Sequence, residues 1–312
     1  MFGRIVAAVE IEPVTGGKPL QRWHAVMKAA NEQTTTVEGY VDWLRQGSGG
    51  AFLLGTVEET DVGAVFALTG WYAPEHVCRG DVRVPPAARG RGHGDELLRA
   101  LSRWAGEHGK TELIGEVRED DPGSLAWVEA RGFREVGRSS RLALDLTRVE
   151  APAPDPPEGI EIVPWSERPD AAHGIYEVMR EAHPDIPGEE DIDVGTFEEW
   201  LERDMRGSSD RAEAVFVAFG GDEVVGYAKL SFDLARERVV MHDLTAVRRA
   251  WRGRGIAAAL KRTQIASAKE QAYERLETQN EVRNEPIRRL NERHGYVVEP
   301  GEITVAGPLA ER

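Results

Sequence analysis

The sequence has little cysteine and no long apolar run. Its single cysteine, Cys78, excludes an intrachain disulfide and is typical of proteins from a reducing cytoplasm. No apolar stretch approaches the roughly 20 residues that a membrane helix requires. The apolar run from Ile5 to Val9 is too short for the core of a signal peptide. We therefore expect a cytoplasmic protein without a membrane partner.

Positive charge is scarce as well. Lys and Arg number 39 against 54 Asp and Glu, which gives a formal net charge of −15 at pH 7. Nucleic acid and anionic membranes repel such a chain, so we expect neither as a partner, and a cationic partner is mildly favoured. The 312 residues are enough for two domains of about 150 residues each.

What the sequence does contain is an internal repeat. A basic, glycine-rich loop occurs at residues 89–94 as Arg-Gly-Arg-Gly-His-Gly and again at residues 252–257 as Arg-Gly-Arg-Gly-Ile-Ala. The offset of 163 residues, from 89 to 252, also relates two further pairs of landmarks, Val84 with Val247 and Gly132-Phe133 with Gly295-Tyr296. Similarity at this spacing indicates a duplicated domain, because solenoid repeats are about 20–50 residues long.

A proline-rich segment separates the two copies. Residues 148–159 include four prolines, which favour a semi-extended spacer and are incompatible with the interior of a sheet. The sequence therefore predicts an N-terminal domain at residues 1–147, a linker at 148–159 and a C-terminal domain at 160–312.

Each copy has the pattern of an α/β domain. In the second copy, runs of apolar and β-branched residues predict strands at 160–163, 214–219, 224–232, 239–247 and 275–279, with the last strands within 297–305. Helical patterns predict helices near 168–181, 196–204, 256–271 and 284–294. The first copy repeats the order of strands, glycine loop and helices over residues 51–130.

The glycine loops lie between a strand and a helix, which is a suitable context for binding an anion. Small or absent side chains let backbone N–H groups approach phosphate oxygens, and the helix adds its positive N-terminal end. The spacing is neither that of a Walker loop nor that of a Rossmann fingerprint. A flexible basic turn or an RNA-binding fragment is the alternative, but the repeated context and the acidic net charge disfavour both.

These motifs resemble a known superfamily. Residues 245–261 resemble the acyl-CoA pyrophosphate loop of the GNAT superfamily, and residues 278–286 and 291–296 resemble its next conserved block. In the first copy, residues 84–94 and 132–133 resemble the same two blocks. The chain as a whole resembles tandem GNAT acetyltransferases. The resemblance implies two domains, each with a mixed, splayed, mostly antiparallel sheet flanked by helices.

The resemblance also implies the ligand and its site. It implies acetyl-CoA as the acyl donor, with pantetheine in the gap between the fourth and fifth strands, and we expect no metal. The candidate CoA-binding residues are Thr245, Ala246, Val247, Arg252, Gly253, Arg254, Gly255, Ile256, Ala257, Asn280, Asn284 and Asn291 in the second copy, and Val84, Arg89, Gly90, Gly92 and Gly94 in the first. For the asparagines, helix capping is the alternative role, and Asn284 directly precedes Glu285-Pro286.

The implied activity is direct transfer of an acetyl group to a primary amine, with no covalent enzyme intermediate. Many GNAT enzymes have a tyrosine four residues before the Gly-Phe/Tyr pair, which protonates the leaving thiolate. Here that position holds Asn291 in the second copy and Val128 in the first, so the source of the proton stays open. We interpret Cys78 as a packed strand residue.

Asp243 is the candidate catalytic base. It precedes Val247 by four residues, where some GNAT enzymes for aminoglycosides have a glutamate, and the same offset places Gly80 in the first copy. Strand alternation predicts that Asp243, Thr245 and Val247 share one face and that His242 lies on the other. We therefore expect catalysis in the second copy and a binding or structural role for the first.

The acceptor amine is predicted to be cationic. Ten acids lie between residues 181 and 204, with Arg203 as their only opposing charge in that segment. Such a rim attracts an aminoglycoside, a polyamine or a basic peptide end, whereas the alternative is a solvated surface without a ligand. Two other functions stay open. One is a non-catalytic acyl-CoA-binding or regulatory protein, and the other is an enzyme like mycothiol synthase, which shares the tandem plan but normally has the missing tyrosine.

Overall fold

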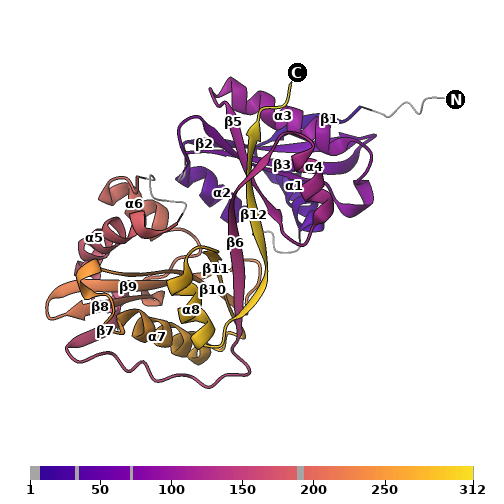
Figure 1. The fold of residues 1–312 in the computed structure, drawn as a ribbon. Helices are drawn as coiled ribbons and strands as arrows, with labels where there is room; N and C mark the ends of the chain where they lie inside the picture. The colour runs from indigo at the N-terminus through magenta and orange to yellow at the C-terminus, as the bar shows by residue number, and fades with distance from the viewer. Residues whose placement is uncertain (1–7, 32–34, 71–72, 188–192, 312) are drawn as a thin grey trace. The chain divides into compact units, whose positions relative to one another are not determined.

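The computed structural model describes residues 8–31, 35–70, 73–187 and 193–311. The chain forms two compact units, which are considered separately. Unit 1 comprises Met1–Val136 with Ile303–Arg312, and unit 2 comprises Gly137–Glu302. Each unit has a mixed, mostly antiparallel sheet flanked by helices (Figure 1), which confirms the predicted fold class.

Unit 1 has the strand order β1-β2-β3-β4-β5-β12. Its elements are β1 (Glu10–Val14), α1 (Gly17–Ala30), α2 (Val37–Gln46), β2 (Gly49–Val57), β3 (Thr60–Thr69), β4 (Val77–Arg83), η1 (Pro86–Ala88), α3 (His93–Glu107), β5 (Glu112–Arg118) and α4 (Pro122–Glu129), followed by the start of β6 (Arg134–Asp145). The sequence patterns located the elements from β2 to α4 to within a few residues, but they left β1, α1, α2 and β6 unassigned.

Unit 2 has the strand order β12-β6-β11-β10-β9-β8-β7. Its elements are β7 (Ile160–Pro164), η2 (Trp165–Glu167), η3 (Pro169–Ala171), α5 (Ala172–Ala182), η4 (His183–Asp185), α6 (Phe197–Asp204), η5 (Ala212–Ala214), β8 (Val215–Gly220), β9 (Glu223–Phe232), β10 (Val239–Val247), η6 (Arg249–Trp251), α7 (Ile256–Glu270), β11 (Arg275–Glu281), α8 (Glu285–Arg293) and β12 (Val297–Pro308). The predicted strand at 239–247 has the same bounds as β10.

The last strand of each sequence copy passes from one unit to the other. β6 begins in unit 1, but its residues 137–145 belong to unit 2, where they pair antiparallel with β11 from Arg275–Asp145 to Glu281–Ser139. β12 likewise has residues 297–302 in unit 2 and 303–308 in unit 1. The compact units therefore divide within these two strands. The boundary at residues 148–159 follows the sequence repeat and stays a prediction.

Two parallel strands diverge in each unit. In unit 2, β10 and β11 pair from Val239–Arg275 to Met241–Glu277, and each strand then continues without pairing to the other. In unit 1, β4 and β5 pair over three residues in the same way before they continue separately. The splayed sheet implied by the family resemblance is thus confirmed, and the gap in unit 2 opens toward the glycine loop that follows β10.

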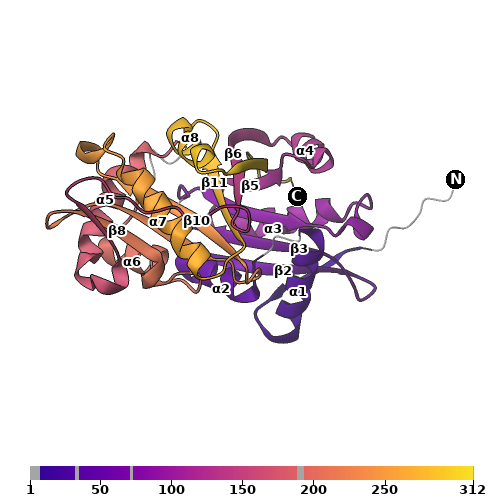
Figure 2. The same ribbon diagram turned by 90° about the horizontal axis from the view of Figure 1, so that it is seen from below.

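Helices cover both faces of the unit 2 sheet. One core cluster joins Leu260 and Ile265 of α7 to the sheet, and a second joins Ile175 of α5 and Trp200 of α6 to the opposite face. Figure 1 shows α5 and α6 on one side of β8 and β9 with α7 on the other, and Figure 2 shows α7 crossing these strands from below. Every residue of β10 therefore faces either the α7 side or the α5/α6 side.

Candidate active site

The glycine loop of unit 2 forms an open cradle of backbone at the start of α7. Gly253 and Gly255 have φ angles of 75° and 88°, a region that L side chains rarely adopt. A Cβ atom at Gly253 would meet no atom within 4 Å, and one at Gly255 would meet only the Pro157 Cγ at 3.6 Å. The first amides of a helix have no intrahelical acceptor, and the first turn of α7 has no acidic residue. The loop therefore fits an anion such as a pyrophosphate.

Arg252 fixes this loop to the end of β10. Its Nε donates a hydrogen bond to the Val247 carbonyl at 3.0 Å, and its guanidinium lies 2.7 Å from the Asp185 carboxylate. Arg249 also pairs with Asp185, and the Arg249 amide donates to Glu181. The side chain of Arg252 thus ties the loop to the end of β10 and to the Asp185 carboxylate.

A β-bulge changes which side chains of β10 share a face. His242 pairs with Leu230, but Leu244 pairs with Lys229, so Asp243 is an extra residue without a partner of its own. The bulge shifts the alternation by one residue. The prediction that Asp243 shares a face with Thr245 was wrong for this reason. His242 lies on the Thr245 side instead, with 3.1 Å between its Nε2 and the Thr245 Oγ1.

A buried polar cluster fills the α7 side of the gap. His242 is 3% exposed and its Nδ1 lies 3.3 Å from both the Tyr296 Oη and the Lys261 Nζ. Because both neighbours donate to Nδ1, the ring proton belongs on Nε2, which faces the Thr245 hydroxyl. The Lys261 ammonium also lies 5.2 Å from the centre of the Tyr296 ring.

The cluster continues through two of the predicted asparagines. Lys261 donates to the Asn291 Oδ1 at 2.5 Å, and the Asn291 Nδ2 donates to the Asn280 Oδ1 at 2.7 Å. Across the gap, the Thr278 hydroxyl donates to the His242 carbonyl at 2.9 Å. Asn284 precedes α8 at the capping position, but its side chain makes no capping hydrogen bond. The structure therefore brings together Thr245, Asn280 and Asn291, with His242, Lys261, Thr278 and Tyr296 as residues that the sequence analysis did not assign to the site.

Burial dominates the electrostatics of this cluster. It lowers the pKa of Lys261 to about 7, and together with Lys261 it holds the pKa of His242 well below its usual range. Burial also raises the pKa of Tyr296 and lowers that of half-buried His294, which lies near Lys261. At neutral pH, His242 and Tyr296 are therefore uncharged, and Lys261 exchanges between ammonium and amine.

Asp243 lies on the other face, toward α5 and α6. Its carboxylate is 44% exposed, lies 2.8 Å from the buried Lys229 Nζ and accepts a hydrogen bond from Ser231 at 2.9 Å. Lys229 also pairs with buried Asp210 at 3.0 Å. Desolvation favours the neutral acid, but the Lys229 ammonium and the Ser231 hydroxyl outweigh it and lower the pKa of Asp243. Asp243 is therefore an ionised, partly accessible carboxylate at neutral pH.

The first copy has the same loop, but the helix that follows the loop begins with different residues. The Arg89 Nε donates to the Val84 carbonyl at 3.1 Å, and Gly90 and Gly92 have φ angles of 74° and 86°. However, the first turn of α3 contains the carboxylates of Asp95 and Glu96, which compete with a bound anion. A Cβ at Gly94 would also lie only 3.1 Å from the Trp127 ring.

None of the polar cluster is repeated in unit 1. β3 pairs Ala67 with Gly80 as β9 pairs Leu230 with His242, so Gly80 corresponds to His242. The prediction that Gly80 matches Asp243 was wrong, because Asp243 is the extra residue of the bulge. By the 163-residue offset, the places of Thr245, Lys261, Thr278, Asn280, Asn291 and Tyr296 are taken by Val82, Leu98, Gly115, Val117, Val128 and Phe133.

Comparison with known proteins agrees with this geometry. The model of the acetyltransferase (GNAT) family matches residues 18–133 and again residues 172–296, which together are more than half of the sequence. The chain belongs to the GNAT acetyltransferase family. The type of reaction that this family match indicates is acetyl transfer.

Relatives of this GNAT protein share its tandem plan. A GCN5-related N-acetyltransferase from Sphaerobacter thermophilus has 21% sequence identity and a TM-score of 0.76, over 97% of this chain and 96% of that chain. A tandem GNAT protein from the clavulanic acid biosynthesis pathway has 19% identity and a TM-score of 0.78, over 98% and 100% of the two chains. These likenesses establish the fold, and two GNAT copies in one chain are thereby confirmed.

One curated relative carries a named activity. The L-2,4-diaminobutyric acid acetyltransferase of Nocardia farcinica is 30% identical to this GNAT protein over 131 residues. The match spans 41% of this chain and 66% of that relative's length. It therefore bears on the type of reaction more than on the substrate.

The described residues of this GNAT protein also show two absences. Among them, no group of three or more His, Cys, Asp or Glu side chains is placed to hold a metal ion. No helix in the same parts of the chain is long and apolar enough to cross a membrane. Cys78 is fully buried in β4, which confirms that it is a packed strand residue, and burial raises the pKa of its thiol to about 11.

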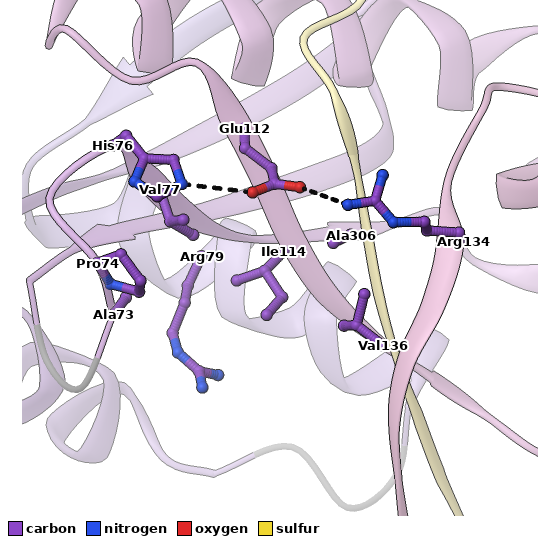
Figure 3. Close-up of a pocket in the computed structure, with 10 residues that line it drawn as sticks. All are labelled: Ala73, Pro74, His76, Val77, Arg79, Glu112, Ile114, Arg134, Val136 and Ala306. Carbon is purple, nitrogen blue, oxygen red and sulfur yellow. Dashed lines mark ion pairs between the residues drawn. The ribbon is translucent and has the colours of Figure 1, made fainter. Parts of the chain in front are cut away.

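Unit 1 contains a cavity of about 240 Å³ between β4, β5 and β12 (Figure 3). Glu112 lies in it between His76 and Arg134, at 3.6 Å from each. The cavity lies at the paired ends of β4 and β5, away from their diverging ends and the glycine loop. It is also smaller than the roughly 300–1,000 Å³ of most small-molecule sites.

Proposed function

We propose that the second copy is the catalytic centre of an acetyl-CoA-dependent N-acetyltransferase, which transfers the acetyl group directly to a primary amine of a cationic small molecule or peptide. The observation that carries this proposal is a set of three features around β10 and β11, which pair only as far as Met241 and Glu277. The glycine loop follows β10, the buried polar cluster lies on the α7 face, and the Asp243 carboxylate lies on the opposite face.

The donor site would be formed by the loop and by β10. The amides of residues 252–257 would contact the pyrophosphate, and Thr245, Ala246 and Val247 would lie along the pantetheine arm. This part of β10 has no pairing with β11 beyond Met241 in the described chain, so a strand-like amide chain can lie beside it. Asn280 and Asn291 would border the thioester through the buried cluster, while Asn284 would lie at the rim.

In this proposal Asp243 is the catalytic base. The acceptor approaches from the α5/α6 face, where its ammonium meets the ionised carboxylate. Asp243 takes a proton from the ammonium, and the neutral amine then attacks the thioester carbonyl carbon. Because the pKa of Asp243 is depressed, the carboxylate is a weak base, and it relies on close contact with the amine more than on basicity.

The acidic segment contributes less to acceptor binding than its composition indicates. Glu189, Glu190 and Asp191 lie outside the described residues. Glu181 accepts a hydrogen bond from the Arg249 amide just before the glycine loop, and Asp185 pairs with Arg252 at its start. Three more of the acids have ion-pair or capping partners: Glu199 with Thr196, Glu202 with Arg206 and Asp204 with Arg203. Arg203 is the only Lys or Arg within the segment itself, but the fold also brings Arg206, Arg249 and Arg252 against its acids. Attraction of a cation is therefore assigned mainly to Asp243.

The proposal is tested by thiol release from acetyl-CoA with a panel of amines. The panel pairs cationic acceptors, such as a diamino acid, a polyamine, an aminoglycoside and a basic peptide end, with neutral amines of similar size. We expect release with the cationic group and a Michaelis constant for the amine that rises with salt. Preference for a neutral amine would refute the cationic acceptor. Binding of acetyl-CoA without release for any amine would favour the non-catalytic alternative.

A further inference from the structure

We propose that Lys261 is the acid that protonates the CoA thiolate as it leaves. This inference rests on the proposed function of the second copy and adds the proton donor that the sequence motifs leave unassigned. Its basis is the position of the Lys261 ammonium inside the buried cluster between β10, α7 and α8.

The reaction requires a proton at this place. Attack of the amine nitrogen on the carbonyl carbon forms the C–N bond, and the C–S bond then breaks to give a thiolate. Asn291 occupies the position from which GNAT tyrosines donate a proton, but an amide is not an acid. The Lys261 Nζ lies 2.5 Å from the Asn291 Oδ1, so an ammonium stands next to the position of the missing phenol.

The described structure places no counter-charge beside the Lys261 ammonium. Its side chain is 1% exposed, and no carboxylate in the described chain forms an ion pair with it. A buried ammonium without a counter-charge destabilises a folded protein. The first copy has Leu98 at the same position of α3, 5% exposed, and forms the same helix and sheet without that cost. The fold therefore does not require a lysine at this position of the helix.

The groups around Lys261 give it a pKa that suits a proton donor. The groups that face it are His242 from β10, Tyr296 before β12, Asn291 from α8 and His294 beyond α8. None of these is an anion at neutral pH, so burial alone brings the pKa of Lys261 to about 7. An acid with a pKa near the working pH donates a proton readily and recovers it readily.

The proton balance then closes. The acceptor nitrogen loses two protons in all: Asp243 takes the first from the ammonium and passes it to solvent, and Asp243 takes the second after the C–N bond has formed. The Lys261 ammonium gives one proton to the sulfur as the C–S bond breaks. The products are the acetylated amine and free CoA thiol. Lys261 is left as a neutral amine, and it regains a proton from solvent when the product leaves, while Asp243 releases the second proton it took.

The test compares Lys261→Met with the control Gln264→Leu. Gln264 lies one turn further along α7, is fully buried, has no hydrogen-bond partner for its side chain among the described residues, and corresponds to Leu101 in the first copy. We expect Lys261→Met to lower kcat by about 10²–10³-fold, within the usual contribution of acid catalysis, with a much smaller change in the acetyl-CoA KM. Wild-type kcat should fall as pH rises through the Lys261 pKa of about 7, and this fall should be absent in Lys261→Met and retained in Gln264→Leu.

A second readout does not depend on turnover. The ammonium should stabilise the thiolate of bound CoA, so the pKa of the bound thiol, followed by ultraviolet thiolate absorbance, should lie below that of free CoA and rise in Lys261→Met. An unchanged thiol pKa together with an unchanged pH profile in Lys261→Met would overturn the inference and assign Lys261 a structural role. If the wild-type protein neither binds acetyl-CoA nor releases thiol, the proposed function of the copy fails instead.

Discussion

The two copies share the backbone geometry of the glycine loop, but they differ in the side chains that are buried near it. Arg252 and Arg89 make the same hydrogen bond to the preceding strand, at 3.0 and 3.1 Å, and the paired glycines of each loop have the same left-handed φ angles. The buried cluster around Lys261, by contrast, is apolar or absent in the first copy. The loop and the splayed strands therefore define a fold that can accept acyl-CoA, whereas the buried polar side chains distinguish the copy that we propose to be catalytic.

The helix termini reinforce this difference. The first turn of α7 has no acid, while the first turn of α3 carries Asp95 and Glu96 and is covered by Trp127 next to Gly94. Asp95 is in turn paired with Arg131, whose guanidinium lies 4.1 Å above the Trp127 ring. The first turn of α3 thus carries negative charge where that of α7 carries none, although a Cβ atom at Gly90 or Gly92 would meet no atom within 4 Å. We therefore expect the first copy to bind acyl-CoA weakly.

The largest effect is expected for Asp243→Asn. Loss of the proposed base should lower turnover by roughly 10²–10⁴-fold, and the acetyl-CoA KM should change little. Because the pKa of Asp243 is lowered, the carboxylate loses its function only at pH values below its ordinary range, so it should not cause a fall in activity near neutral pH. Steady-state kinetics measure both effects. Wild-type turnover in Asp243→Asn, combined with a loss in His242→Ala, would transfer the role to His242.

Substitutions at the matching positions 98 and 261 should change the free energy of unfolding in opposite directions. Leu98→Lys buries an unpaired charge in unit 1 and should lower the free energy of unfolding by about 3–5 kcal/mol. Lys261→Met removes such a charge from unit 2 and should leave stability unchanged or raise it by about 1 kcal/mol. Chemical denaturation measures both. A large loss of stability in Lys261→Met would show that the cluster is mainly structural.

The smallest effect is expected in the first-copy loop. The double variant Arg89→Ala with Gly92→Val should leave steady-state acetylation within about twofold of wild type, because unit 1 lacks the candidate base and the buried cluster. The matched variant in the second copy, Arg252→Ala with Gly255→Val, is the positive control. If the first-copy variant folds normally and loses all activity, and the second-copy variant retains it, our choice of active copy is wrong.

The sequence predicted well what depends on local pattern. β10 has the predicted bounds, and α7 begins at the predicted residue. Apolar alternation and glycine position are local signals, and a duplicated chain provides each of them twice. The family motifs then placed the loop and the diverging strands.

Features that depend on long-range contacts could not be predicted from these local patterns. The extension of β6 and β12 from one unit into the other depends on long-range strand pairing. The bulge at Asp243 depends on pairing with β9. Neither feature appears in the periodicity of a single strand. The buried cluster had one visible signal. Lys261 shares a helical stripe with Gln264 and Ala268, both fully buried, and the first copy has leucines at the positions of Lys261 and Gln264. Lys261 is the charged residue among these buried positions, and a buried charge indicates a site more than a surface.

The most direct test of the central claim is calorimetric titration of acetyl-CoA into the wild-type chain and into Gly255→Val and Gly92→Val. The two glycines are equivalent N-terminal caps of α7 and α3 with φ angles of 88° and 86°, so each valine introduces the same backbone strain, and thermal unfolding checks that both variants remain folded. We predict that Gly255→Val weakens acetyl-CoA binding by tenfold or more, about 1.4 kcal/mol, whereas Gly92→Val binds like wild type. Unchanged affinity in a folded Gly255→Val, or a matching loss in Gly92→Val alone, would contradict the assignment of the donor site to the second copy.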